Sequence, residues 1–193
     1  MPRLSSLALA LAPLALALVI PTGCKKAVET AESAAIAAAS GGKASLTADG
    51  KIEVKTDEGT AKIDLAGDKG VATITGTNAD GTKFNAAFGT AAKAPEGFPL
   101  PMMDGLNVVQ GAVSDKGGKK SYAVMGQIAK TAKEVADFYE PAMKKAGLTV
   151  TRSETNLGGL VMLALSGEGG GHKMGVAAQE AKGQTTVTFG GEW

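Results

Sequence analysis

The sequence predicts an α+β protein: an antiparallel β-meander followed by an antiparallel sheet with one packed helix, after a signal peptide and a tether. Three observations support this fold class. Apolar and polar residues alternate along short runs that end in glycine-containing turns, which is typical of antiparallel strands. Residues 131–147 form one amphipathic stretch with helix start and stop signals. Residues 1–23 have the composition of an export leader.

The chain has 193 residues, enough for one domain or two small ones. It contains 27 glycines but only 4% aromatic residues, which predicts many turns and a core of small side chains. The formal net charge is +1, and removal of Arg3 with the leader leaves 19 basic and 19 acidic side chains. Because nucleic-acid-binding surfaces need an excess of Lys and Arg, we expect no nucleic-acid partner.

The leader is predicted to span residues 1–23. Arg3 supplies a short positive region, and an apolar run from Leu7 to Ile20 follows it. This run is shorter than the roughly 20 residues that a membrane-spanning helix needs. We therefore interpret it as a cleaved signal peptide, with an amino-terminal transmembrane anchor or a buried helix as the alternatives.

The only cysteine of the chain, Cys24, directly follows this leader. The residues "PTGC", Pro21 to Cys24, resemble the lipobox of bacterial lipoproteins, although Pro21 stands where the pattern usually has Leu. The resemblance implies cleavage between Gly23 and Cys24, and attachment of diacylglycerol and palmitate-type chains to Cys24. Two or three acyl chains hold a protein firmly on a bilayer. Because Lys25, not Asp, follows the cysteine, the resemblance implies the periplasmic face of the outer membrane.

Residues 24–42 are predicted to be a lipidated cysteine and an Ala-rich tether. Residues 25–40 are rich in the strong helix formers Ala and Glu, and Ser40-Gly41-Gly42 ends the run. Its length is near the limit at which an isolated helix is stable. We interpret it as a solvated, partly helical tether. The alternative is self-association through a stripe formed by Ala27, Ala31, Ala34 and Ala38.

Residues 43–92 are predicted to form the β-meander. Ile52 and Val54 alternate with charged residues, and the same period of two recurs in the following runs. Asp-Gly and related pairs separate the runs and supply the turns of tight hairpins. We expect four or five antiparallel strands with one apolar and one solvated face, including residues 51–56, 60–66, 71–77 and 82–88.

Residues 93–193 are predicted to form an α+β module of order ββαββββ. Three prolines within residues 95–101 predict a stiff, extended linker at its start. In the helix, Thr131 and Glu134 match a capping box, whereas Pro141 should kink or divide it. The inward stripe is expected to contain Val135, Phe138, Tyr139, Ala142 and Met143. The expected strands cover residues 106–113, 120–128, 148–154, 160–166, 172–179 and 185–191.

The "FPLP" lead-in, the strand pair, the "TAKEVADFYEPAMKKAG" helix and the trailing strands resemble a module found in many bacterial envelope lipoproteins whose activity is uncharacterised. The Asp-Gly meander is similar to segments that lie between lipobox and module in such proteins. The resemblance covers roughly residues 43–193. It implies a fold and a location in the cell envelope, but no activity.

The common catalytic and metal-binding patterns are missing from the sequence. One histidine, His172, is too few for a two-histidine zinc site, and we do not expect it to bind metal with Glu168. Asp57 and Glu58 lie at a predicted turn, with no sign of the burial that would shift their pKa values. The sequence therefore predicts no catalytic residue, no metal site and no cofactor.

We expect a lipid-anchored cell-envelope protein with a binding or structural role and no enzymatic activity. Its expected partners are the membrane, through Cys24, and another envelope protein or the cell wall. One alternative is an enzyme whose site assembles only in three dimensions. The other is a small outer-membrane β-barrel, suggested by the terminal aromatic residue of "TVTFGGEW" but disfavoured by the short strands.

Overall fold

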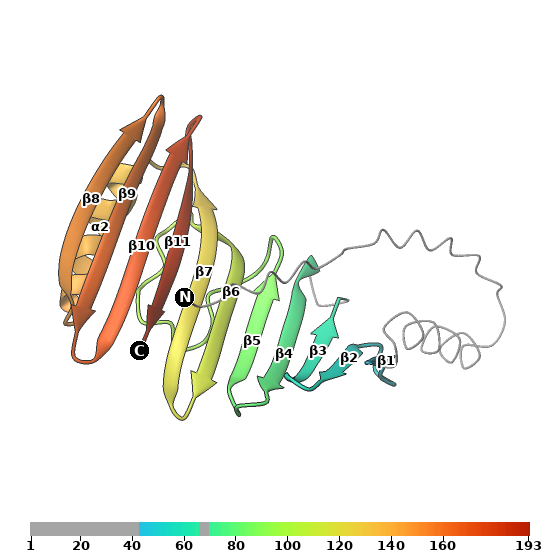
Figure 1. Ribbon diagram of the computed structural model, residues 1–193. Coiled ribbons are helices and arrows are strands. Elements are labelled where there is room, and N and C mark those ends of the chain that lie inside the picture. The colour runs from blue at the N-terminus through green and yellow to red at the C-terminus, as the bar shows by residue number, and fades with distance from the viewer. Residues whose placement is uncertain (1–42, 66–69) are drawn as a thin grey trace, which may run out of the picture.

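A computed structural model describes residues 43–65 and 70–193 of the chain. The predicted signal peptide, the Gly23–Cys24 cleavage site and the tether up to residue 42 lie outside the described residues. Within them, the strands follow one another as a broad sheet, and one helix lies against one end of it (Figure 1).

The described part of the chain contains eleven strands and one helix. The first five strands are β1 (Ala44–Leu46), β2 (Ile52–Thr56), β3 (Gly59–Asp64), β4 (Ala72–Asn78) and β5 (Lys83–Phe88). The next elements are β6 (Asn107–Lys116), β7 (Lys119–Ile128) and the helix α2 (Ala132–Lys145). The last four strands are β8 (Thr149–Leu157), β9 (Leu160–Gly169), β10 (His172–Ala181) and β11 (Gln184–Glu192).

All these strands belong to one antiparallel sheet, in the order β1-β2-β3-β4-β5-β6-β7-β11-β10-β9-β8. The chain moves through β1 to β7 as consecutive neighbours, and α2 then carries it to the far edge. From there β8 to β11 return, and β11 pairs with β7 from Thr185 opposite Ile128 to Glu192 opposite Ser121. The predicted antiparallel sheet with one packed helix is therefore confirmed for the described residues.

The predicted meander and the predicted module share this sheet. Strand β5 pairs with β6 over its whole length, from Lys83 opposite Asp115 to Phe88 opposite Gln110. The expected boundary near residue 93 lies in the segment between these two strands. That segment is more than a linker, because Leu100 and Met103 are buried in the core.

The core lies between the sheet and α2, which packs across β8, β9 and β10. Helix side chains meet inward residues of β7, β9, β10 and β11. The ring of Phe189 on β11 has edge-on contacts with Tyr139 of α2, at 4.9 Å, and with Phe98, at 5.5 Å. Phe98 comes from the segment before β6, so this segment and the helix cover the same face of the sheet.

Helix α2 begins with the predicted capping box, in which Thr131 and Glu134 satisfy each other's backbone N–H groups. The helix continues through Pro141 to Lys145, so the expected division at Pro141 does not occur. Tyr139 and Met143, on either side of the proline, are both buried in the same core, which holds the two parts of the helix together.

The predicted inward stripe of α2 is wrong at Phe138, and Ala142 is only half-buried. Phe138 is 36% exposed, whereas Ala136, which the prediction omitted, is buried. Successive helical residues are rotated by about 100°. Phe138 is therefore turned about 100° away from Tyr139, which occupies the inward position. The buried residues of the helix are Ala132, Val135, Ala136, Tyr139 and Met143.

Candidate functional site: the open face of the sheet

The apolar side of the meander lies on the face opposite α2, which we call the open face. On β7, Tyr122 and Val124 are buried in the core, so Ala123 between them points to the other side. Ala123 is the register partner of Ala112 on β6, which in turn pairs with Ala86 on β5. Because register partners share a face, the apolar residues aligned with Ala86 also lie on the open face.

One register row crosses the open face on all eleven strands. It contains Leu46, Ile52, Ile63, Ile74, Ala86, Ala112, Ala123, Gly190, Gly175, Ser166 and Thr151. The branched aliphatic side chains lie on β1–β4, whereas β5–β11 contribute Ala, Gly, Ser and Thr. Since neighbouring strands are about 4.8 Å apart, the row measures roughly 50 Å along the sheet.

The branched end of this row is part of a cluster that we call the meander patch. Helix α2 packs on the other face of the sheet, against β8, β9, β10 and Phe189 of β11, and the core cluster contains none of the patch residues. Its side chains are half-buried by their neighbours. The meander patch consists of Leu46, Ile52, Val54, Ala61, Ile63, Ile74, Phe84, Ala86 and Phe88.

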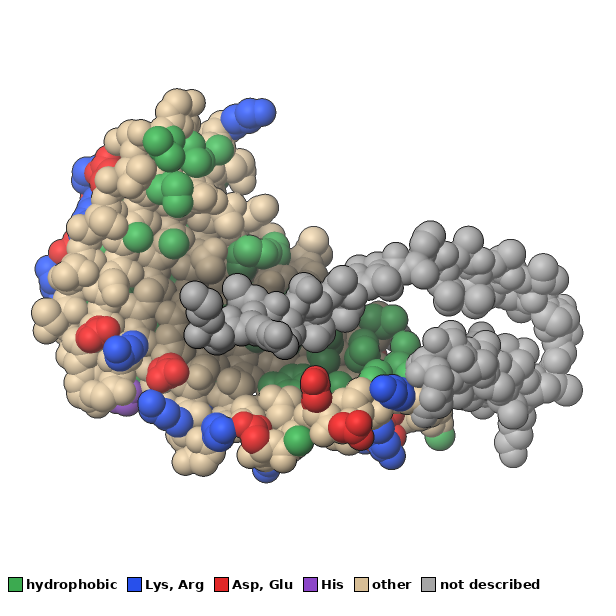
Figure 2. All heavy atoms as spheres, viewed as in Figure 1, with side chains coloured by type: hydrophobic (Ala, Val, Ile, Leu, Met, Phe, Trp, Pro, Cys, Tyr) green, Lys and Arg blue, Asp and Glu red, His purple; other side chains and the backbone are tan. Residues whose placement is uncertain are grey.

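Figure 2 looks onto the open face and shows hydrophobic side chains gathered over the strands of the meander. Charged side chains follow the lower margin of the same view. Ion pairs join the turns and strand ends of the sheet: Lys116 with Asp80 at 2.6 Å, Lys119 with Glu192 at 3.1 Å and Lys173 with Glu168 at 3.0 Å. These turns and strand ends therefore contain both signs of charge in matched pairs.

Asp80 also has the most strongly shifted pKa among these groups. The hydrogen bond from the Lys116 ammonium holds the pKa of Asp80 well below its usual range, and Thr82 adds to the effect. Because these groups are exposed, such pairs contribute little to stability. They keep these turns and strand ends ionised and solvated, in contrast to the apolar patch.

Phe84 shapes the meander patch through the glycine opposite it. Gly76 on β4 is the register partner of Phe84, and a Cβ atom there would collide with the Phe84 ring and with the backbone carbonyl of Thr60. The ring therefore covers the bare backbone at Gly76. A larger residue at position 76 would displace Phe84 and disturb the patch.

A separate pocket of about 280 Å³ lies on the helix side of the sheet, between β5, β6 and the segment after β5. Asn85, Ala87 and Gly111 supply part of its floor, and Lys93 and Pro95 contribute from the segment above. None of its lining residues is a carboxylate. The carboxylates with lowered pKa values, such as Asp80 and Asp137, lie elsewhere on the surface.

His172 stacks on the terminal residue Trp193, with ring centroids 4.2 Å apart and planes at 13°. Its Nδ1 atom is buried without a hydrogen-bond partner. Glu168 forms the ion pair with Lys173. Across residues 43–65 and 70–193, no three potential metal ligands from His, Cys, Asp or Glu gather in one place.

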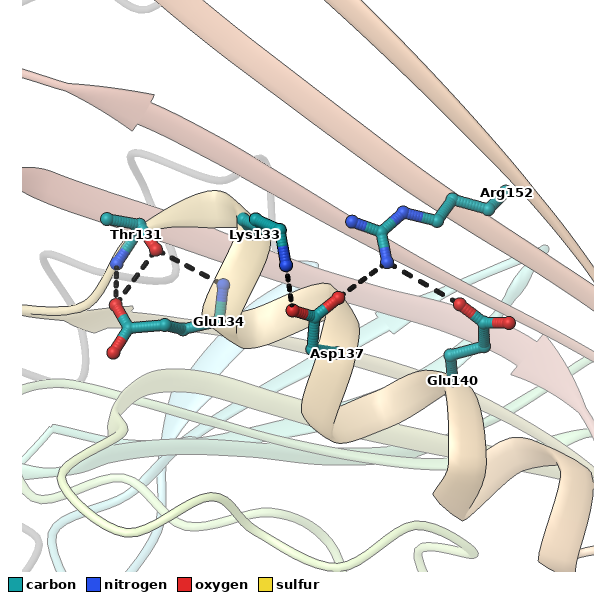
Figure 3. A network of polar contacts seen from close by, with 6 residues as sticks. All are labelled: Thr131, Lys133, Glu134, Asp137, Glu140 and Arg152. Carbon is teal, nitrogen blue, oxygen red and sulfur yellow. Dashed lines mark hydrogen bonds and ion pairs between the residues drawn. The ribbon is translucent and has the colours of Figure 1, made fainter.

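A polar network joins the exposed side of α2 to β8 (Figure 3). The Arg152 guanidinium on β8 donates to Asp137 at 2.7 Å and lies 3.5 Å from Glu140. Lys133 and Lys144 pair with the same two carboxylates along the helix. Arg152, with help from Lys133, lowers the pKa of Asp137, whereas Lys144 and then Arg152 lower the pKa of Glu140.

The predicted lipidation and cleavage residues, Cys24 and Gly23, are not among the described residues, so this structure does not place them relative to the open face. Asp57 and Glu58 lie in the turn between β2 and β3. The sequence predicted one apolar face for the meander but not its position opposite α2, because alternation within a strand carries no information about the neighbouring module.

Comparison with protein-family models, with curated proteins and with solved structures finds no match for this chain. Among the residues that the structure describes, no helix has both the length and the apolar character needed to cross a membrane.

Proposed function

We propose that this chain is a lipid-anchored cell-envelope protein that binds another envelope protein through the meander patch. The main support for the proposal is the group of half-buried Ile, Val and Phe side chains on the open face, on which no described helix packs. Contiguous exposed apolar patches of this kind usually mark interaction sites. Beside the patch, the register row continues with the small residues Ala112, Ala123, Gly190 and Gly175, so a broad partner can approach the sheet there.

The proposed anchor is Cys24, acylated after cleavage behind Gly23. Its support is the leader, the solitary cysteine and the resemblance of "PTGC" to a lipobox. Residues 25–42 separate Cys24 from the first described residue, Lys43. A tether of this length lets the folded part lie away from the bilayer while the acyl chains stay inserted.

Acylation is tested by growth of the source cells, or of a bacterial host with lipoprotein-processing enzymes, with radiolabelled palmitate. We expect label in the wild-type protein and none in the Cys24→Ser variant, which would also keep its leader or leave the membrane fraction. Mass spectrometry of the mature wild-type protein should find a lipid-modified Cys24 as the first residue. A mature chain that begins at another residue would refute the anchor.

The binding role is tested by crosslinking in intact envelopes followed by purification of the protein. We expect the wild type to capture a reproducible partner and Ile74→Lys, within the meander patch, to lose it. Thr75→Lys is the matched control, because Thr75 is exposed on the opposite side of the same strand. Equal capture by both variants, with both still folded, would exclude the meander patch as the binding surface.

A further inference from the structure

Strand β8 forms one end of the sheet, and its outer side has no strand partner in the described part of the chain. Eight of its nine residues are exposed, and Val150 is half-buried. Edge strands are usually protected from further pairing by short length, charged side chains, proline or a bulge. The two charged residues of β8, Arg152 and Glu154, have opposite signs, so a register that pairs them removes this protection. Strand β8 has no proline or lysine, and its register with β9 is regular from Thr149 to Leu157. At the other edge, β1 has only three residues.

The turn after β8 determines which backbone groups of β8 point to its unpaired edge. Gly158 and Gly159 have φ angles of 55° and 91° and form the two-residue turn that closes the Leu157–Leu160 pair. In such a hairpin the closing pair is hydrogen-bonded, and hydrogen-bonded pairs alternate along the ladder. The odd-numbered residues of β8 therefore bond to β9. The even-numbered residues of β8 direct their N–H and C=O groups to the unpaired edge.

We propose that β8 pairs with β8 of a second copy of this chain, antiparallel about a two-fold axis at Ser153. This register places Arg152 opposite Glu154 of the second copy, and both residues present their free backbone groups to each other. It also aligns Thr149 with Leu157, so that the whole strand is paired. An axis at Arg152 or at Glu154 would place like charges directly opposite, which is destabilising.

The charges around Arg152 favour the same register. Arg152, Lys133 and Lys144 contact only two carboxylates, Asp137 and Glu140, in the network on α2 (Figure 3). The network thus has one positive charge in excess. Glu154 lies on the same side of β8 as Arg152 and forms no ion pair with this network. In the proposed dimer, Glu154 of the second copy supplies the missing negative charge.

Cysteine crosslinking of the full-length, acylated protein tests this register. Directly opposed side chains lie within disulfide distance, so Ser153→Cys should oxidise to a covalent dimer in membranes and in detergent. Thr155→Cys alone should not form a dimer. In this register the two side chains at position 155 lie four residues apart along the strands, roughly 13 Å. The double variant Thr151→Cys/Thr155→Cys should recover the dimer. Wild type, which contains only Cys24, and Ser45→Cys on β1 measure the background.

Three outcomes would overturn the proposal. These are a monomeric Ser153→Cys protein, equal crosslinking by every single-cysteine variant, or a Ser153→Cys adduct with a different protein. The last result would assign the edge to another partner. Because the variants lie outside the meander patch, failure here leaves the proposed binding role intact.

Charge reversal provides an independent measurement on the protein without added cysteines. Glu154→Arg should weaken the dimer about tenfold in sedimentation equilibrium, since two opposite-charge pairs become like-charge pairs. Glu168→Arg is the matched control, an exposed carboxylate on β9 that faces the other side of the sheet. Equal effects of both variants would show a general charge effect and would contradict the proposed register.

Discussion

Tyr139 connects α2 to the segment before β6. Its side chain is fully buried, and its hydroxyl oxygen accepts a hydrogen bond from the backbone N–H of Met103 at 3.1 Å. Burial raises the pKa of Tyr139, which keeps the hydroxyl neutral. The bond satisfies the buried N–H of Met103, for which no residue nearby in the sequence supplies an acceptor. A single hydroxyl thus holds an irregular segment against the helix.

Tyr139→Phe should lower the free energy of unfolding by about 1–3 kcal/mol, because the Met103 N–H is left buried and unpaired. Denaturant unfolding measures this loss. Tyr122→Phe is the matched control: its hydroxyl donates to the carbonyl of Gly97, an exposed residue whose carbonyl water can reach. The control should lose less than about 1 kcal/mol. An equal or larger loss for Tyr122→Phe would contradict this account.

At the scale of elements, α2 is held at both ends and along one side. The N–H of Ala132 donates to Glu180 of β10 at 2.8 Å, which places a carboxylate at the positive end of the helix. Close to the other end, Gly167 of β9 lies so near the helix that a Cβ atom there would meet the Met143 side chain at 2.7 Å. The Arg152 network fixes the side that faces β8.

This network makes the helix sensitive to acid. The pKa values of Asp137 and Glu140 are lowered in the folded protein. Their stabilisation is therefore fully present above the ordinary carboxyl pKa, about 4, and is lost as the pH falls through the lowered values. Unfolding measured between pH 7 and pH 2 should show a smaller loss of stability for Arg152→Gln than for wild type. An unchanged acid dependence would show that Arg152 does not lower these pKa values.

At the scale of the whole molecule, one sheet presents two different faces. Under α2 and the segment before β6 it forms the core, which includes Val124, Val187 and Phe189. On the other side, the apolar residues of β1–β5 have no described cover. Because β5 pairs with β6, the meander and the helix-covered strands form one continuous sheet. The meander patch and the core therefore lie on opposite faces of this sheet.

Much of the fold could be predicted from local patterns. The alternation of "KIEVKT" and "TTVTFGG" places β2 and β11 within one or two residues of their observed bounds, because period two is a property of a single strand. The capping box of Thr131 and Glu134 is similarly local. The outward position of Phe138 was not predictable from the helical period alone, since the choice between Phe138 and Tyr139 depends on what lies beneath them.

Local sequence patterns specify where the chain forms strands, turns and a helix, since hydrophobic alternation, turn glycines and caps act over a few residues. The sequence also contains the predicted leader and Cys24, on which the proposed anchor rests. Long-range contacts specify that β11 pairs with β7, that the meander patch faces away from α2, and that β8 is left at an edge. These features depend on register between residues far apart in the chain, and a shift of one residue would reverse the face of every side chain in a strand.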